Sequence, residues 1–327
     1  MINRRNFILC GSLGLWVAPL VARAQPTKTV RRIGVLSPGP ALSPAQYQGV
    51  WTPLRELGWV EGQNLAFERR WADGKPERLR PLADELVRFQ VELIVTIGTD
   101  ATVAARNATA SVPIVMLSAA DPVGAGLVVS LARPGGNVTG ISMTGPEVET
   151  KRLALLRELL PRVQQVGVLV DPTTAVSGYS RNESEAAYRS LGLRPIFVEV
   201  TLSGGVLDAV AQVARRGGEA LVVHRDVLFL LNGVKIMDAA MTYRLPAVVE
   251  DRSMLEAGGL MSYVIDEDDQ LKRFATFVDR ILRGAKPSDL PVEQPTKFEL
   301  GINLKTAKAL GLVGPQSLLL RADELIQ

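Results

Sequence analysis

The sequence has very few of the residues on which most enzyme active sites depend. It contains one cysteine, Cys10, and one histidine, His224, in 327 residues. No Cys/His cluster can therefore hold zinc, and a lone histidine in a strand-like run is more typical of a packed residue than of a catalyst. The Gly-x-Ser-x-Gly elbow and the P-loop pattern are also missing, since Gly74-Lys75 runs into Pro76. We predict that the protein is not an enzyme and has neither a cofactor nor a metal site.

An excess of charge of one sign is missing from most of the chain. The sequence has 37 basic and 34 acidic residues, but residues 1–24 contain three arginines and no acid. The remaining residues are therefore balanced in formal charge. Binding to nucleic acid requires a basic stripe that neutralises phosphates, so no nucleic-acid partner is expected.

The first 24 residues have the pattern of an export signal. The basic start is followed by an uncharged stretch of 16 residues, Phe7–Ala22, and by the small-x-small sequence Ala22-Arg23-Ala24. This stretch is shorter than the roughly 20 residues of a membrane span. Arg4-Arg5 also fits a twin-arginine signal. We predict cleavage near Ala24 and a periplasmic location, with a retained anchor helix as the alternative and the export route left open.

The apolar pattern repeats along the chain. From Val30 onward, short apolar runs alternate with amphipathic stretches, which indicates parallel strands joined by crossover helices. Apolar runs near residues 33, 65, 92 and 113 are followed by similar runs near residues 166, 196, 219 and 246. The order is kept at a nearly constant offset. We therefore predict an α/β protein with two similar Rossmann-like lobes, parallel sheets and a ligand cleft between the lobes.

This organisation also predicts where a ligand binds. In an open parallel sheet, ligands bind beyond the carboxyl ends of the strands, and two facing lobes place both sets of strand-end loops on one cleft. Tyr179 and Tyr263 are candidates for stacking on a flat ligand. The full set of candidate ligand-binding residues is Ser37, Thr99, Asp100, Ser118, Ala119, Asp121, Asp171, Thr173, Thr174, Asp226, Glu250 and Tyr263.

Several of these candidates have two interpretations. Thr99 and Asp100 open a predicted helix, so its first N–H groups can bind a carboxylate, or the two side chains can cap the helix. An Asp100 carboxylate that faces the cleft favours an ammonium group instead. Asp226 and Glu250 are further ammonium acceptors, although most such acidic residues are exposed caps and charges. Asp121 either caps the helix that follows it or faces the ligand.

The glycine-rich segment Ser118–Gly140 begins like a nucleotide-binding loop. Gly124 and Gly126 fit the start of a dinucleotide fingerprint, but the third glycine of that motif is replaced by Val129. We therefore predict a turn at Ala119–Pro122, a short helix over about Val123–Leu131 and a Pro-Gly-Gly turn before the next strand.

Six segments together resemble a known family. They are residues 58–64, 113–142, 151–161, 258–264, 281–312 and 317–326. As a set they are similar to the substrate-binding proteins of ABC transporters, of the tryptophan/tyrosine-binding type with a type I periplasmic-binding fold. Two positions depart from that pattern, because Asp100 stands where members commonly have proline and Val264 where they commonly have glycine.

The resemblance implies a fold and a function. It implies two lobes joined by a three-crossover hinge that close on a small molecule, often an aromatic amino acid or a related compound. It also implies a monomer that delivers this ligand to a permease driven by an ATPase, both on separate chains. The expected lobes are residues 30–142 with about 264–290, and residues 143–263 with about 291–327. A ligand sensor for a membrane receptor and a hydrolase or isomerase using cleft carboxylates are the alternatives.

Overall fold

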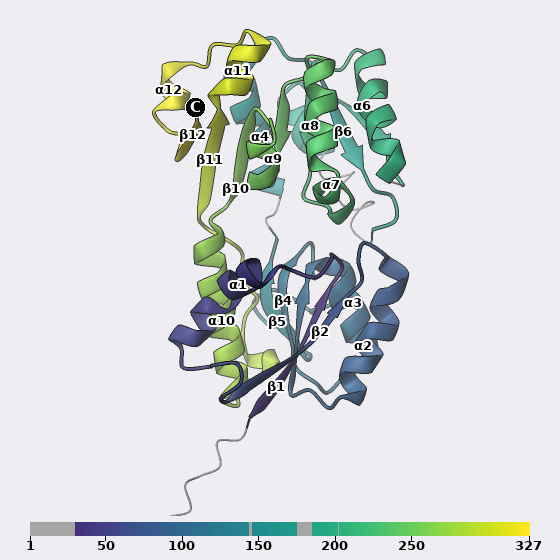
Figure 1. The fold of residues 1–327 in the computed structure, drawn as a ribbon, viewed down its shortest axis with the longest axis vertical. Coiled ribbons are helices and arrows are strands. Elements are labelled where there is room, and N and C mark those ends of the chain that lie inside the picture. Colours follow the sequence, from purple (N-terminus) through teal and green to yellow (C-terminus); the bar gives the residue numbers. More distant parts are fainter. Residues whose placement is uncertain (1–29, 144–145, 175–184, 202) are drawn as a thin grey trace, which may run out of the picture.

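The computed structural model describes residues 30–143, 146–174, 185–201 and 203–327. Two α/β lobes lie one above the other in the view of Figure 1. The predicted export signal and Tyr179 lie outside the described residues. Among the described residues, no helix has both the length and the apolar character needed to span a membrane.

The first lobe is built on a parallel sheet of five strands in the order β2-β1-β3-β4-β5. Its strands are β1 Arg31–Ser37, β2 Leu65–Trp71, β3 Leu93–Ile97, β4 Ile114–Ala119 and β5 Val138–Ser142. Its helices are α1 Pro44–Glu56, η1 Pro76–Arg78, α2 Leu79–Arg88, α3 Gly98–Ala108, α10 Glu267–Leu282 and η3 Pro287–Asp289. One buried apolar cluster covers each face of this sheet, as a parallel sheet requires.

The second lobe is built on seven strands in the order β12-β11-β10-β9-β8-β6-β7, all parallel except the antiparallel pair β10–β11. Its strands are β6 Gln165–Val170, β7 Arg194–Glu199, β8 Ala220–Val223, β9 Ala247–Val249, β10 Met261–Ile265, β11 Phe298–Asn303 and β12 Glu324–Ile326. Its helices are α4 Pro146–Leu159, η2 Ser203–Gly205, α6 Val206–Arg215, α7 Val227–Leu231, α8 Gly233–Thr242, α9 Arg252–Glu256, α11 Leu304–Leu310 and α12 Gln316–Leu319.

The predicted repeat of two similar lobes is confirmed. The strand order β2-β1-β3-β4 of the first lobe recurs as β7-β6-β8-β9 in the second. The repeat extends to side-chain packing, because Gly34 and Gly167 hold equivalent places on β1 and β6. A Cβ on Gly34 would lie 3.1 Å from the Leu86 methyls of α2, and a Cβ on Gly167 would lie 2.3 Å from Val213 Cγ1 of α6. In both lobes, glycine lets the covering helix approach the strand closely.

The chain passes between the lobes three times. It leaves the first lobe after β5, returns from β10 into α10, and leaves again after η3 to form β11. Helix α10 packs on the first sheet, where Phe274 and Phe277 join the cluster that contains Ile33. The last segment stays on that sheet as far as Glu293, whose N–H donates to Gly140 O at 3.0 Å. The carboxyl ends of both sheets therefore face one another (Figure 1).

The short helix predicted over about Val123–Leu131 is wrong. This segment forms a series of turns, in which the N–H groups of Leu127 and Val128 both donate to Pro122 O. Glycine is a poor helix former, and Gly126 adopts a φ of 67° that a right-handed helix excludes. The predicted turn before β5 is present, with Gly135 at a φ of 76°.

Candidate functional site

The predicted ligand-binding residues lie where the sheets of the two lobes face each other. In the first lobe they end β1 and β4 or begin α3, and in the second they follow β6, β8 and β9 or lie on β10. In chain order these places hold Ser37; Thr99 and Asp100; Ser118, Ala119 and Asp121; Asp171, Thr173 and Thr174; Asp226; Glu250; and Tyr263.

Asp226 faces carboxylates from both lobes. It caps α7 by accepting a hydrogen bond from Leu228 N at 2.7 Å. Burial, together with the charges of Asp171 and Asp100, raises the pKa of Asp226 to about 6 against the lowering effect of its backbone hydrogen bonds. Asp100 belongs to the first lobe and Asp171 to the second. Carboxylates of both lobes thus act electrostatically on Asp226, with no basic residue among the groups that most affect this pKa.

Two further contacts join the lobes beside Asp226. Arg225 Nη1 lies 3.2 Å from Glu267 Oε1, at the start of α10 in the first lobe. Leu231, at the end of α7, has its Cδ1 atom 3.5 Å from the place where a Cβ on Gly74 would lie. The turn after β8 and the helix α7 therefore form the second lobe's part of this contact between the lobes.

Thr99 and Ser118 bond within the first lobe. The Thr99 hydroxyl accepts from Ala120 N at 2.8 Å, and the Ser118 hydroxyl accepts from Gln270 Nε2 of α10 at 3.1 Å. Neither Thr99 nor Asp100 caps α3, because the helix begins earlier, at Gly98, and its N-cap Ile97 has no side-chain cap. The capping interpretation of these two residues is therefore wrong.

The β4 loop is held in a strained form by its own side chains. Ser118 and Asp121 have φ values of 59° and 34°, in the left-handed region, and such conformations cluster at functional sites. Asp121 accepts from Gly124 N at 2.8 Å, so it closes a turn and does not cap a helix. The Ala119 side chain is fully buried. The Ser37 hydroxyl, at the end of β1, accepts from Gly39 N at 3.3 Å.

The loop after β6 is organised by Asp171. Its Oδ1 atom accepts from the Thr173 N–H at 2.8 Å and from the Thr173 hydroxyl at 2.6 Å. The Thr174 hydroxyl donates to Asp171 O at 3.2 Å. Both threonines therefore shape the loop that holds Asp171.

Tyr263 lies at the hinge, between two cavities. Its ring stacks on Phe298 with the centroids 5.3 Å apart and an angle of 21° between the planes. A cavity of about 30 Å³ lies on the side of Arg225 and Glu250. A larger one of about 310 Å³ opens on the side of Lys151. Tyr263 and Phe298 thus line both cavities.

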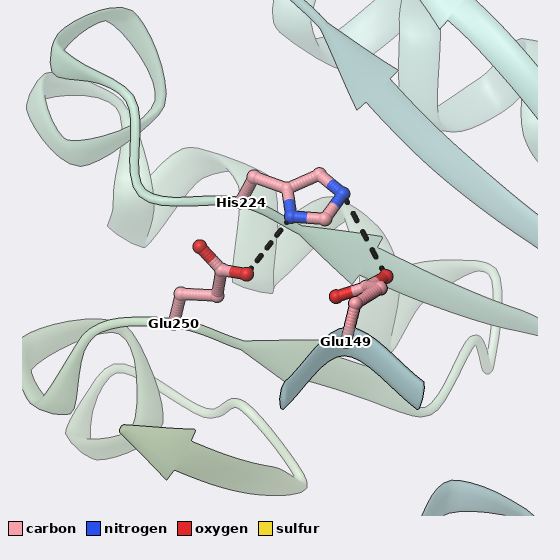
Figure 2. A group of neighbouring side chains, drawn as sticks. All are labelled: Glu149, His224 and Glu250. Atoms are coloured by element: carbon pink, nitrogen blue, oxygen red, sulfur yellow. Dashed lines mark hydrogen bonds and ion pairs between the residues drawn. The ribbon is translucent and has the colours of Figure 1, made fainter. Parts of the chain in front are cut away.

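A buried cluster of charges lies beneath the turn that follows β8. Arg152 of α4 forms ion pairs with Glu149 and, at 2.5 Å, with Glu250 Oε1. His224 Nδ1 lies 2.9 Å from the same Glu250 oxygen, and its Nε2 lies 4.0 Å from Glu149 Oε1. Figure 2 shows the imidazole between the two carboxylates. Glu250 also accepts from Arg225 N at 2.9 Å, so both of its oxygens have partners within the protein.

These charges stabilise one another against the cost of burial. Burial alone would raise the pKa of Glu250, but Arg152 and His224 outweigh it and hold that pKa well below its usual range. Burial alone would lower the pKa of His224, but Glu250 and Glu149 outweigh it and raise the pKa to about 9. Burial also raises the pKa of the neighbouring Tyr188 hydroxyl, and the Glu149 charge raises it further. The cluster thus sets two basic side chains, Arg152 and His224, against two acidic ones, Glu149 and Glu250.

The cluster already contains the cation that its carboxylates need. Ligand atoms of Glu149, His224 and Glu250 lie within 4.8 Å of one another, a spacing that a metal ion could bridge. The Arg152 guanidinium, however, contacts both carboxylates directly. In the described part of the chain, Glu149 Oε1, Arg152 Nε, the Tyr188 hydroxyl and His224 Nε2 are buried without a hydrogen-bond partner. Such atoms cost free energy, so the cluster depends on the ion pairs of Arg152.

The raised pKa of His224 predicts how stability depends on pH. A group whose pKa is raised from 6.5 to about 9 on folding adds stability below pH 6.5 and loses that contribution as the pH rises through 9. We expect the free energy of unfolding to fall by about 1–3 kcal/mol over this interval. Urea titrations at pH 6.5, 7.5, 8.5 and 9.5 measure it. His224→Gln should remove this slope, and an equal slope in both proteins would contradict the assignment.

Sequence reasoning missed three residues of this cluster, Glu149, Arg152 and Tyr188. It interpreted Glu250 as an acceptor for an ammonium group. Glu250 is no exposed charge, because its side chain is only 11% exposed. Arg152 precedes Leu156 by four residues and Leu159 by seven, and both leucines are buried. A charged residue in phase with an apolar stripe is the signal that could have found it. The prediction that His224 is a packed residue agrees with its place in the cluster.

Comparison with protein-family models matches residues 33–326 to a family described as ABC transporter substrate binding protein. A curated relative, a tyrosine-binding protein from Clostridioides difficile, is 26% identical over 288 residues, which cover 88% of this chain and 82% of the relative.

Two solved structures are similar over 91% of this chain and 100% of their own. One is an ABC domain from Streptococcus pneumonia in complex with L-Trp, with 28% identity and a TM-score of 0.84. The other is a conserved domain protein from Vibrio cholerae, with 28% identity and a TM-score of 0.85.

Proposed function

The chain belongs to the ABC transporter substrate binding protein family, and from this premise we propose that it captures a small, amino-bearing molecule between its lobes. We further propose that it is exported to the periplasm as a monomer and delivers this ligand to a permease whose ATPase is a separate chain. The ligand class we favour is an aromatic amino acid or a closely related amine.

The observation that carries the proposal is the meeting of carboxylates between the lobes. Asp226 of the second lobe lies close enough to Asp171 and to Asp100 of the first lobe for both to raise its pKa. Like charges brought together in a partly buried place repel each other. A bound ammonium group removes this repulsion, and because Asp100 and Asp226 come from different lobes, the same group draws the lobes together.

The proposed ligand class combines this charge with the similarity to the relatives. The curated relative is named for binding tyrosine, and one solved neighbour holds L-Trp. Both amino acids carry an ammonium group and a flat ring. In this chain, Asp100, Asp171 and Asp226 are the proposed acceptors for the ammonium group. The aromatic pair of Tyr263 and Phe298 at the hinge is the proposed neighbour of the ring.

The proposed mechanism is closure of two preformed lobes. The three crossings lie between β5 and α4, between β10 and α10, and between η3 and β11, so the lobes can rotate about them while each sheet stays intact. A ligand favours the closed form only by the contacts that it makes better there. A cation held between Asp100 and Asp226 is such a ligand, since the two carboxylates belong to different lobes.

A matched series of compounds tests the ligand class. The series begins with L-Trp and L-Tyr, which carry both an ammonium and a carboxylate group. Tryptamine and tyramine keep only the ammonium group, and indole-3-propionate and 3-(4-hydroxyphenyl)propionate keep only the carboxylate. Bound ligand raises the melting temperature by mass action, so a thermal-shift titration ranks them. We expect the amino acids or the amines to raise the melting temperature and the deaminated acids to leave it unchanged.

Two results would overturn parts of this proposal. Stabilisation by the deaminated acids alone would contradict an ammonium-binding site while leaving capture by lobe closure in place. If mass spectrometry detected chemical turnover of a bound compound, this result would contradict a function in transport and favour a hydrolase or isomerase. The N-terminal sequence of the protein recovered from its native location tests export and cleavage near Ala24 independently.

A further inference from the structure

Arg225 is the residue whose side chain makes an ion pair between the lobes beside the proposed ligand site. It follows β8 in the second lobe, and its Nη1 atom lies 3.2 Å from Glu267 Oε1. Glu267 is the first residue of α10, which packs against the strands of the first lobe. This ion pair therefore joins the turn after β8 in the second lobe to the start of α10 in the first.

The same guanidinium has a second acidic neighbour on its own lobe. Its Nε atom lies 3.9 Å from Asp251 Oδ2, and Asp251 is fixed as the N-cap of α9, where it accepts from Ser253 N at 2.9 Å. Arg225 therefore lies between two carboxylates that belong to different lobes. Asp251 belongs to the same lobe as Arg225, whereas Glu267 belongs to the other lobe.

The backbone of Arg225 is held firmly while its side chain is free to exchange partners. The Arg225 N–H donates to Glu250 Oε2 at 2.9 Å. Glu250 is in turn held by Arg152 and His224 in the buried cluster. The Arg225 side chain is 40% exposed, so it can move between Asp251 and Glu267 without disturbing buried groups.

The start of α10 is strongly acidic and faces this arginine. Asp266 caps the helix, and Glu267, Asp268 and Asp269 occupy its first turn. Asp269 is paired with Arg273 of α10 and with Lys297, which directly precedes β11, at 2.6 Å each. In the described part of the chain, the ion pair that Glu267 makes is with Arg225. The negative first turn of α10 thus pairs with Lys297 at the hinge and with Arg225 after β8.

We propose that Arg225 is a positioning residue for lobe closure, which exchanges Asp251 for Glu267 as its main partner when the lobes come together. It acts on the proposed capture of ligand through its ion pair with Glu267, and the inference rests on the proposed function only in assuming that the lobes close.

This ion pair is strong enough to shift the ratio of closed to open protein but too weak to hold the lobes closed by itself. Exposed ion pairs contribute little because water and salt screen them, so Arg225 and Glu267 should shift the ratio of closed to open protein by about two- to fivefold. A ligand must supply much more to convert a mostly open population to a mostly closed one. The ion pair therefore lowers the binding free energy that the ligand must supply for closure. It still allows the lobes to open and release the ligand.

Energy transfer between two fluorophores measures the closed fraction without any ligand. Cys10 is the only cysteine, so Cys10→Ser gives a background for Arg88→Cys on α2 and Lys235→Cys on α8, which are exposed helix residues of the two lobes. We expect Arg225→Gln and Glu267→Gln each to lower the closed-to-open ratio about two- to fivefold. The double variant should lower it no further, and 1 M NaCl should remove most of the difference.

The exchange of partners makes a prediction of opposite sign. Asp251→Asn keeps an N-cap but removes the charge that competes with Glu267, so the closed-to-open ratio should rise. Arg252→Gln is the matched control, because Arg252 is exposed and its ion pairs, to Glu256 and Glu324, stay within the second lobe. Additive effects of Arg225→Gln and Glu267→Gln, or a fall in the ratio in Asp251→Asn, would overturn the proposal. Neither result bears on which ligand binds.

Discussion

Arg152→Met is expected to lower the free energy of unfolding by about 3–5 kcal/mol, which is the range for removing one partner of a buried ion pair. Methionine keeps most of the length and the apolar stem of arginine, so the packing of α4 on the second sheet changes little. The positive charge between Glu149 and Glu250 is lost. Urea titration at pH 7 measures the loss, and the loss should not be accompanied by a change in m value.

The expected loss is large because the carboxylates cannot reach water. The Glu149 and Arg152 residues are only 8% and 5% exposed, and the Glu250 side chain is 11% exposed. Without the guanidinium, one cation, His224, remains for two buried anions. An uncompensated buried charge is far more costly than a buried ion pair. The cost should therefore shrink at acidic pH, where a carboxylate can take up a proton.

Two variants separate charge from packing. Lys151→Met is the matched control, since Lys151 precedes Arg152 on α4 and is exposed, and it should change stability by less than about 0.5 kcal/mol. Adding Glu149→Gln to Arg152→Met should recover part of the loss, because fewer charges are then unpaired. If Arg152→Met and Lys151→Met were equally stable, the buried cluster would not have the role described here.

The fold was predictable from sequence because its signals are local and repeated. Apolar runs such as those around Ile33 and Val166 are strand signals by themselves, and their recurrence in the same order predicted two similar lobes. The strand order and Gly34 and Gly167 agree with that prediction. The helix predicted after Val123 is absent because the backbone freedom of Gly124 and Gly126 favours turns.

The places of the candidate residues at the strand ends were also predictable, but the partners of their side chains were not. Strand ends follow from the α/β pattern, and this placed Asp226 and Asp100 correctly at the facing edges. Whether a side chain faces ligand or bonds within its own lobe depends on residues distant in sequence. Thr99 bonds to the loop at Ala120, and Ser118 bonds to Gln270 across 152 positions of the chain. Such pairs leave no periodic signal.

Asp226→Asn should have opposite effects on ligand binding and on stability. The variant keeps the N-cap of α7, because asparagine caps helices as well as aspartate does, and it removes the charge that faces Asp100 and Asp171. Loss of one partner of a desolvated charge pair costs about 2–5 kcal/mol of binding, so affinity for an amino-bearing ligand should fall about 30-fold or more. Calorimetry with the compound that gives the largest thermal shift measures this.

The same substitution should stabilise the ligand-free protein. An aspartate whose pKa is raised to about 6 on folding binds its proton more tightly in the folded state, so its contribution to stability falls as the pH rises from 3.8 through 6. Above pH 6, the ionised Asp226 is destabilising. We expect Asp226→Asn to be more stable than the wild type by about 1–2 kcal/mol at pH 7.5, with the difference vanishing near pH 4.

Proton release links the two effects. An ammonium ligand requires Asp226 to be ionised, so binding at pH 6 should release about half a proton from wild type, seen as a dependence of the binding enthalpy on the ionisation enthalpy of the buffer. Affinity should weaken about tenfold for each pH unit below 6. Asp226→Asn should release none, and Asp238→Asn, an exposed aspartate on α8, should behave like wild type. Equal release from all three proteins would place the ligand's ammonium group away from Asp226.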